Sequence, residues 1–261
     1  MNRIDQKFIQ LKQKNKKAFI AFITAGYPNL ATTAKLVLEL EKRKVDIIEL
    51  GVPFSDPLAD GPVIQEASEH ALKAGTNLIK ILNLVKQLRK DTSLPVCLMT
   101  YYNPVFCFGD KRFIDQAVAS GVDGVIIPDL PCEEAREFIS YANKKGLANI
   151  CFIAPTSSYA RIKAIAKAAK GFIYYVSLTG VTGARKTIAP DLLAKLFEIK
   201  RITAKPVCVG FGISDANQVR QVQDIADGVI IGSAIVQKIK ENINRSDLVK
   251  IVGNFVGRLN V

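Results

Sequence analysis

Hydrophobic positions along the chain fall into short continuous runs, and most of these runs are followed by a longer stretch with helical spacing. Short apolar runs bounded by turn residues are typical of strands that are buried on both faces of a parallel sheet. On this basis we predict strands at residues 18–24, 45–50, 95–100, 123–127, 147–154, 171–177, 206–209 and 227–231.

The stretches outside these runs repeat apolar residues every three to four positions, which indicates amphipathic helices. Asn29 and Pro62 are typical helix-start residues, and Gly75 and Gly146 are typical stops. We predict helices at residues 5–13, 30–43, 62–73, 77–90, 110–120, 133–145, 159–169, 190–201, 215–223 and 247–259.

Strands that alternate with helices imply right-handed crossovers and a parallel sheet. Eight such units in 261 residues favour a (β/α)₈ TIM barrel, with an extra N-terminal helix and an extra helix after the second strand. The chain shows no interdomain linker, so we predict one domain over residues 1–261. The alternative is a doubly wound open sheet, which would carry a Gly-rich turn after the first strand that this chain lacks.

The net charge of +12 raises the possibility of a nucleic-acid partner. However, the basic residues are spread over many predicted helices and no nucleic-acid-binding motif is present, so we expect no such partner. No apolar run approaches the roughly 20 residues that span a bilayer. The N-terminus has no apolar core typical of a secretory signal, so we expect a soluble, cytoplasmic protein without membrane contact.

The cysteines and the histidine limit the possible chemistry. The five cysteines are odd in number and lack CxxC spacing, which favours reduced thiols, and Cys97, Cys151 and Cys208 are expected in the core. A single histidine, His70, excludes a multi-histidine metal site and argues against a Ser-His-Asp triad. We therefore expect no metal.

The segment ELGVPFSDPLADG, residues 49–61, combines an acid at the end of a strand with an irregular loop. Glu49 lies among apolar residues, where ionisation is costly unless a partner compensates. Asp56 and Asp60 follow in the loop. These acids fit proton transfer at a working site, but a buried, hydrogen-bonded structural Glu49 fits equally well on this segment alone.

Glycines follow three late strands, in the segments 180–183, 210–212 and 232–233. In a TIM barrel the active site lies at the C-terminal ends of the strands, and the last two loops commonly bind phosphate. Glycine lets backbone N–H groups approach an anion closely, although tight turns also require glycine. The pattern favours two carboxylates that transfer protons on a phosphorylated substrate.

Several motifs closely resemble the alpha chain of tryptophan synthase, and the resemblance runs nearly end to end. They are FITAGYP (22–28), IELGVPFSDPLADGPVIQ (48–65), YYNPV (101–105), GVTGAR (180–185), VGFGIS (209–214) and DGVIIGSAIV (227–236). The resemblance implies retro-aldol cleavage of indole-3-glycerol phosphate to indole and glyceraldehyde 3-phosphate. By this match, Glu49 is the acid–base, and Asp60 stabilises positive charge on the indole ring.

The resemblance also implies roles for other residues. An indole pocket would be lined by Phe22, Tyr101, Ile126, Tyr174 and Phe211, and Thr182 would close a lid over it. The phosphate would be held by Gly183, Gly212, Gly232 and Ser233. A beta chain that carries pyridoxal phosphate would dock at Pro53, Asp56 and Asn103 in an alpha2-beta2 tetramer, which leaves this chain without a cofactor of its own.

Two alternatives remain open at this point. Indole-3-glycerol-phosphate synthase, a related barrel, requires a catalytic lysine at a strand end, and none is found. A subunit that only binds and activates a beta partner is the other alternative, and the intact Glu49 and Asp60 argue against it.

Overall fold

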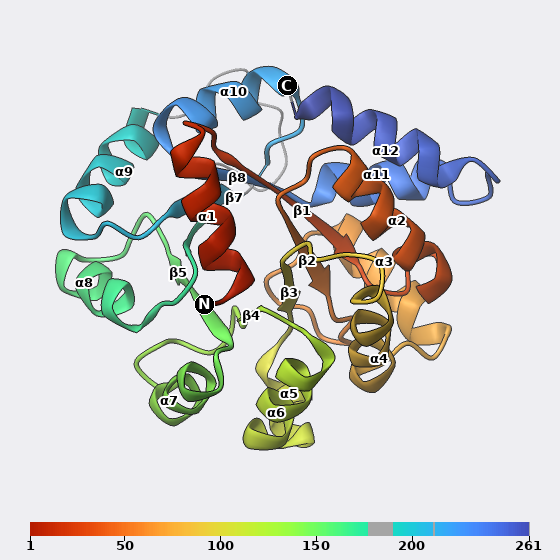
Figure 1. Ribbon diagram of the computed structural model, residues 1–261, viewed down its shortest axis with the longest axis horizontal. Helices are drawn as coiled ribbons and strands as arrows, with labels where there is room; N and C mark the ends of the chain where they lie inside the picture. The colour runs from red at the N-terminus through yellow and green to blue at the C-terminus, as the bar shows by residue number, and fades with distance from the viewer. Residues whose placement is uncertain (177–189, 211, 261) are drawn as a thin grey trace.

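In the computed structural model, which describes residues 1–176, 190–210 and 212–260, eight parallel strands close into a barrel (Figure 1). The strands follow chain order, and β8 pairs with β1. The predicted TIM barrel is confirmed, and the open sheet is excluded. The strands are β1 (Ala18–Thr24), β2 (Ile47–Gly51), β3 (Val96–Met99), β4 (Gly124–Ile126), β5 (Ala148–Ile153), β6 (Ile173–Val176), β7 (Val207–Gly210) and β8 (Gly228–Ile231).

Helices surround the barrel, and both predicted extra helices are present, as α1 and as the α3–α4 pair between β2 and β3. In the same ranges of the chain the helices are α1 (Arg3–Gln13), α2 (Leu30–Lys42), α3 (Pro62–Lys73), α4 (Leu78–Leu88), α5 (Tyr102–Phe108), α6 (Asp110–Ser120), α7 (Arg136–Lys145), α8 (Tyr159–Ala168), α9 (Pro190–Ile202), α10 (Ala216–Ile225), α11 (Ser233–Glu241) and α12 (Leu248–Leu259).

Two helices were absent from the sequence prediction. No element is predicted between the strand that ends at residue 100 and the helix that starts at 110, but α5 begins at Tyr102 and has Pro104 in its first turn. Proline is tolerated there because the first N–H groups of a helix have no intrahelical acceptor. The sequence pattern also predicts no helix directly after Gly232, but in the structure α11 begins there at Ser233.

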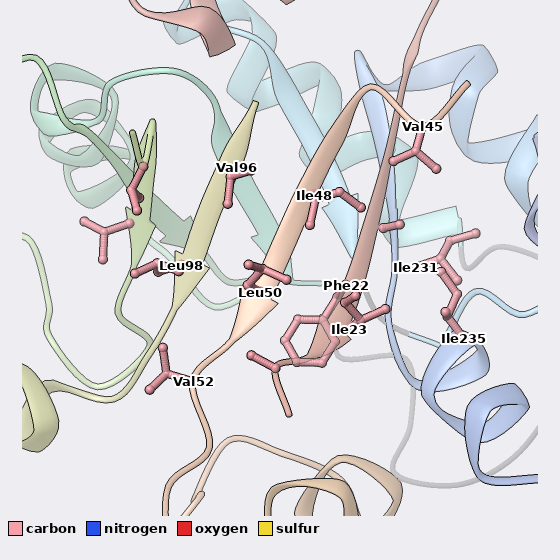
Figure 2. Close-up of a cluster of buried hydrophobic side chains, with 14 of the residues drawn as sticks. Phe22, Ile23, Val45, Ile48, Leu50, Val52, Val96, Leu98, Ile231 and Ile235 are labelled. Carbon is pink, nitrogen blue, oxygen red and sulfur yellow. The ribbon is translucent and has the colours of Figure 1, made fainter. Parts of the chain in front are cut away.

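Hydrophobic side chains form two layers. One layer lies between the strands and the surrounding helices, and Figure 2 shows part of it, with Ile48 and Leu50 of β2 near Val96 and Leu98 of β3. The other layer fills the barrel interior and includes Cys97, one of the three cysteines expected in the core. Those three cysteines, Cys97, Cys151 and Cys208, are all buried.

Helix α1 covers the N-terminal end of the barrel, and Figure 1 shows it inside the ring of helices. Its apolar side chains Ile4, Phe8 and Leu11 join the interior layer, and the Phe8 ring centroid lies 5.9 Å from that of Phe172. This end is therefore filled by side chains, which leaves the C-terminal ends of the strands for a site.

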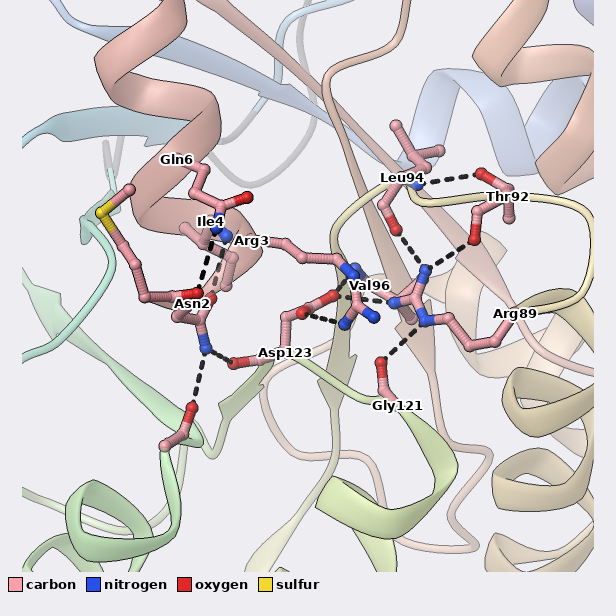
Figure 3. Close-up of polar contacts among 12 residues, drawn as sticks. Asn2, Arg3, Ile4, Gln6, Arg89, Thr92, Leu94, Val96, Gly121 and Asp123 are labelled. Carbon is pink, nitrogen blue, oxygen red and sulfur yellow. Dashed lines mark hydrogen bonds and ion pairs between the residues drawn. The ribbon is translucent and has the colours of Figure 1, made fainter.

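A buried carboxylate fixes α1 to the barrel (Figure 3). Asp123, just before β4, is 3% exposed and accepts hydrogen bonds from Arg3 Nη1 at 2.9 Å and from Arg89 Nη2 at 2.7 Å. The backbone N–H of Val96 donates to the same carboxylate at 2.9 Å. Charge-assisted bonds of this kind hold the helix against two strands.

Within the described residues, no helix is long and apolar enough to cross a membrane.

Candidate active site

Glu49 lies on β2, where its Cα pairs with Phe22 on β1 and with Cys97 on β3. The side chain is 0% exposed, and neither carboxylate oxygen has a hydrogen-bond partner among the residues that the structure describes. Burial therefore disfavours the charged form and raises the pKa of Glu49 to about 8. Within the described part of the chain, no residue supplies the hydrogen bonds that a purely structural buried glutamate would need.

Asp60 lies in the loop between β2 and α3, and it is oriented by Tyr101 at the end of β3. The Tyr101 hydroxyl donates to Asp60 Oδ2 at 3.1 Å and accepts from the backbone N–H of Ala59 at 2.8 Å. Burial raises the pKa of Asp60 to about 6, while the hydrogen bond from Tyr101 lowers it. At neutral pH the two acids consequently differ, since Glu49 is mainly protonated and Asp60 mainly ionised.

Three of the predicted pocket residues lie on strands of the barrel. Phe22 approaches Gly51 so closely that a Cβ at that position would lie 2.5 Å from the Phe22 Cζ. Tyr174 on β6 is 7% exposed, and both Glu49 and Asp60 are close enough to raise its pKa further, after burial as the main cause. Ile126 on β4 is fully buried in the interior layer. These predicted pocket residues all lie in the barrel or at its C-terminal end.

The first backbone N–H groups of α11 have no acceptor within their own helix. Gly232 precedes this helix and makes no side-chain cap hydrogen bond, and its carbonyl accepts from Ile235 and Val236. The first N–H groups of a helix favour an anion through their position and the helix dipole. Gly212 follows β7 with a φ of +70°, which suits glycine. Thr182, Gly183 and Phe211 lie outside the described residues.

The predicted partner contacts differ in exposure. Asp56 and Asn103 are exposed, whereas Pro53 is buried within this chain. The sequence interpretation missed two large exposed apolar side chains nearby, Leu58 at 91% exposure and Phe106 at 66%. In the sequence, a leucine within the turn-rich segment and a phenylalanine close to Asn103 were the signals that could have identified these two side chains.

The sequence interpretation gave Tyr101 only as a pocket wall and missed its hydrogen bond to Asp60. The two residues are separated by 41 positions, so only the folded barrel brings them together. Among residues 1–176, 190–210 and 212–260, no group of three His, Cys, Asp or Glu side chains is placed to hold a metal ion.

Known proteins resemble this chain over its full length. The family model for the tryptophan synthase alpha chain matches residues 8–254. The tryptophan synthase alpha chain of Geotalea uraniireducens is 52% identical over 259 residues, which cover 99% of this chain and 97% of that protein. The chain therefore shares sequence with this family well beyond the quoted motifs.

Solved structures agree with the sequence matches. The crystal structure of tryptophan synthase subunit alpha from Legionella pneumophila is 40% identical, has a TM-score of 0.93, and covers 100% of this chain and 97% of its own. A chain of the tryptophan synthase a2b2 complex from Pyrococcus furiosus is 40% identical, with a TM-score of 0.87 and coverage of 93% and 97%. The chain with the buried Glu49 belongs to the tryptophan synthase alpha chain family.

Proposed function

We propose that Glu49 and Asp60 carry out, in this chain, the alpha reaction of tryptophan synthase. This is the retro-aldol cleavage of indole-3-glycerol phosphate to indole and glyceraldehyde 3-phosphate. The observation that carries the assignment is Glu49, a fully buried acid on β2 with no hydrogen-bond partner in the described part of the chain. Such an acid is neutral near pH 7 and can donate a proton to substrate.

The proton of Glu49 goes first to the indole ring carbon that bears the glycerol phosphate side chain. The resulting carboxylate then removes the proton from the hydroxyl on the adjacent side-chain carbon. As this proton leaves, the carbon–carbon bond breaks, the hydroxyl oxygen becomes the aldehyde oxygen, and indole is released. Glu49 ends the cycle protonated, as it began, so one residue with a pKa of about 8 serves as both acid and base.

Asp60 stabilises the positive charge that develops on the ring when the ring carbon is protonated. Its pKa of about 6 keeps it ionised at neutral pH, and it accepts a hydrogen bond from the indole N–H. The hydrogen bond from Tyr101 fixes the carboxylate in position before substrate arrives. Two acids in neighbouring environments thereby take opposite protonation states.

The rest of the pocket positions the substrate. In this proposal the indole ring is contacted by Phe22, Tyr101, Ile126, Tyr174 and Phe211. The phosphate is held by Gly183, Gly212, Gly232 and Ser233. The start of α11 directly after Gly232, without a side-chain cap, supports the phosphate assignment. Thr182 closes over the substrate and excludes water.

A tryptophan synthase beta chain is the proposed partner, in an alpha2-beta2 tetramer. Asp56 and Asn103 are exposed on adjacent segments, because the β2–α3 loop bonds to Tyr101 directly before α5. Leu58 and Phe106 add exposed apolar surface to the same segments. Pro53 belongs to the same loop as Asp56 and stays a proposed contact, although its side chain is buried in the isolated chain. Pyridoxal phosphate belongs to the beta chain in this proposal, and the alpha chain uses none.

Incubation of the pure chain with indole-3-glycerol phosphate, with and without a beta chain, tests the proposed reaction. Release of indole in either mixture supports catalysis by this chain, and a higher rate with the beta chain supports activation by the partner. A chain that binds the beta chain but releases no indole in either mixture would instead be a non-catalytic subunit.

A further inference from the structure

The last residue of β1, Thr24, carries a buried hydroxyl for which the described part of the chain supplies no hydrogen-bond partner. Thr24 is 1% exposed, so its hydroxyl has lost its hydrogen bonds to water without replacing them, which is costly. The two carboxylate oxygens of Glu49 are in the same condition. Buried polar groups of this kind are rare in folded proteins and indicate a contact with something other than the chain itself.

The alternation of side chains along β1 places Thr24 on the inner face of the barrel. Side chains two positions apart lie on the same face of a strand. Ile20 belongs to the interior layer, so Phe22 and Thr24 face the interior as well. Phe22 pairs with Glu49 across the sheet. Thr24 therefore lies at the level of Gly51, about 7 Å closer to the C-terminal end of the barrel than this pair.

Strand β1 separates Glu49 from the proposed phosphate site. It pairs with β2, which carries Glu49, on one side and with β8 on the other (Figure 1). Gly232 and Ser233 follow β8 directly, at the start of α11. A Cβ at Gly232 would lie 3.2 Å from the Phe22 Cδ1, so the end of β8 is close to the side chains of β1. The order around the barrel is thus acid, Thr24 and phosphate site.

The side chain of indole-3-glycerol phosphate has the same order. Its first carbon carries the hydroxyl that Glu49 deprotonates, its second carbon carries another hydroxyl, and its third carbon carries the phosphate. A substrate with the first carbon at Glu49 and the phosphate at the start of α11 brings its second hydroxyl past the end of β1.

We propose that the Thr24 hydroxyl binds the second side-chain hydroxyl of the substrate and makes the site specific for a glycerol chain. This inference rests on the proposed function. A hydroxyl can both donate and accept, so Thr24 can pair with another hydroxyl in either direction. A substrate without that hydroxyl leaves Thr24 unpaired, and a buried polar group left unpaired is a strong basis for rejecting the wrong substrate.

The kinetics of T24V and T24S, measured with the beta chain present, test this role. Valine keeps the shape of threonine without the hydroxyl, so T24V is expected to lose about tenfold in kcat/KM for indole-3-glycerol phosphate. T24S keeps the hydroxyl and is expected to stay close to the wild type. The change to valine breaks no hydrogen bond of the Thr24 side chain in the described part of the chain, so T24V is expected to unfold at a temperature no lower than the wild type.

T92V is the matched control, because it removes another buried threonine hydroxyl, in the segment before β3 at the opposite end of the barrel. The Thr92 hydroxyl oxygen accepts a hydrogen bond from the backbone N–H of Leu94 at 2.9 Å. T92V is therefore expected to lose stability but to keep the wild-type kcat/KM.

Indole-3-propanol phosphate separates a hydroxyl contact from a change in pocket shape. This probe has the ring and the phosphate but neither side-chain hydroxyl, so its Kd from calorimetry is expected to be the same for the wild type and T24V. The role of Thr24 would be overturned by an unchanged kcat/KM in T24V, by a T24S that loses as much as T24V, or by equal weakening of both ligands. Failure of the proposed function shows separately, because the wild type itself then releases no indole, and this inference falls with it.

Discussion

Tyr101 donates its phenolic hydrogen to Asp60 Oδ2 across 3.1 Å, while the neighbouring backbone N–H of Ala59 donates to the Tyr101 oxygen. The tyrosine thus holds the loop between β2 and α3 at two consecutive residues. It also lowers the pKa of Asp60 against the larger effect of burial. A residue expected only to form a pocket wall therefore sets both the position and the charge of a proposed catalytic group.

Removal of the Tyr101 hydroxyl tests this relationship. Y101F is expected to lose about tenfold in kcat/KM, since a hydrogen bond to a charged group contributes on the order of 1.5–3 kcal/mol. The pKa of Asp60 should rise above its value of about 6, so the acid limb of the kcat/KM profile should move to higher pH. Y102F is the control, because Tyr102 bonds to Asp110 on the neighbouring helix. An acid limb that stays in place would show that Tyr101 does not tune Asp60.

The burial of Glu49 also predicts how stability depends on pH. Its pKa rises from 4.5 to about 8 on folding, so the folded state binds the proton more tightly than the unfolded state. The contribution of Glu49 to stability is therefore present below pH 4.5 and is lost as the pH rises through about 8. Over this interval the wild type should lose about 1.4 kcal/mol per pH unit relative to E49Q, measured by urea unfolding. Parallel pH profiles for the two chains would contradict a neutral, buried Glu49.

The Asp123 cluster predicts a stability effect at the opposite end of the barrel. D123A leaves the half-buried Arg89 without its carboxylate partner and frees α1, so unfolding should become easier by about 3 kcal/mol. Urea unfolding measures the change. D247A is the control, because the Arg245–Asp247 pair is exposed and should contribute nothing measurable. Equal stability of the two variants would mean that the Asp123 cluster does not hold α1.

The close approach of Gly51 to Phe22 predicts an effect on substrate binding. A Cβ at Gly51 would lie 2.5 Å from the Phe22 Cζ and displace the ring, so G51A should raise KM for indole-3-glycerol phosphate by about tenfold. G257A adds the same methyl group in α12 at an ordinary 3.4 Å from Arg43 and serves as the control. An unchanged KM in G51A would remove Phe22 from the indole pocket.

Local sequence patterns were sufficient for most of the fold. The predicted bounds of β1 at Ala18–Thr24, α3 at Pro62–Lys73 and α6 at Asp110–Ser120 are confirmed, because each has a continuous apolar run or a clear start residue. The sequence prediction assigned no element to residues 101–108, where α5 lies, and Pro104 is in the first turn of this helix, where a proline loses no hydrogen bond. Terminal residues elsewhere shifted by a few positions, as strand ends depend on pairing with neighbours.

Local sequence patterns predicted less of the candidate site than of the fold. One segment made Glu49 and Asp60 candidates, the family resemblance gave them their predicted roles, and the burial of Glu49 followed from its apolar neighbours. The Tyr101–Asp60 bond joins residues 41 positions apart, so it depends on the closed barrel. The burial of Pro53 likewise depends on how the loop packs after β2.

The most direct measurement is the steady-state turnover of indole-3-glycerol phosphate by E49Q, with the beta chain present. Glutamine keeps the shape of Glu49 but cannot donate or accept the proton, so kcat should fall by about 1,000-fold. E66Q makes the same chemical change at an exposed position on α3 and should retain wild-type turnover. Near-normal indole release by folded E49Q would contradict the assignment of Glu49 as the acid–base.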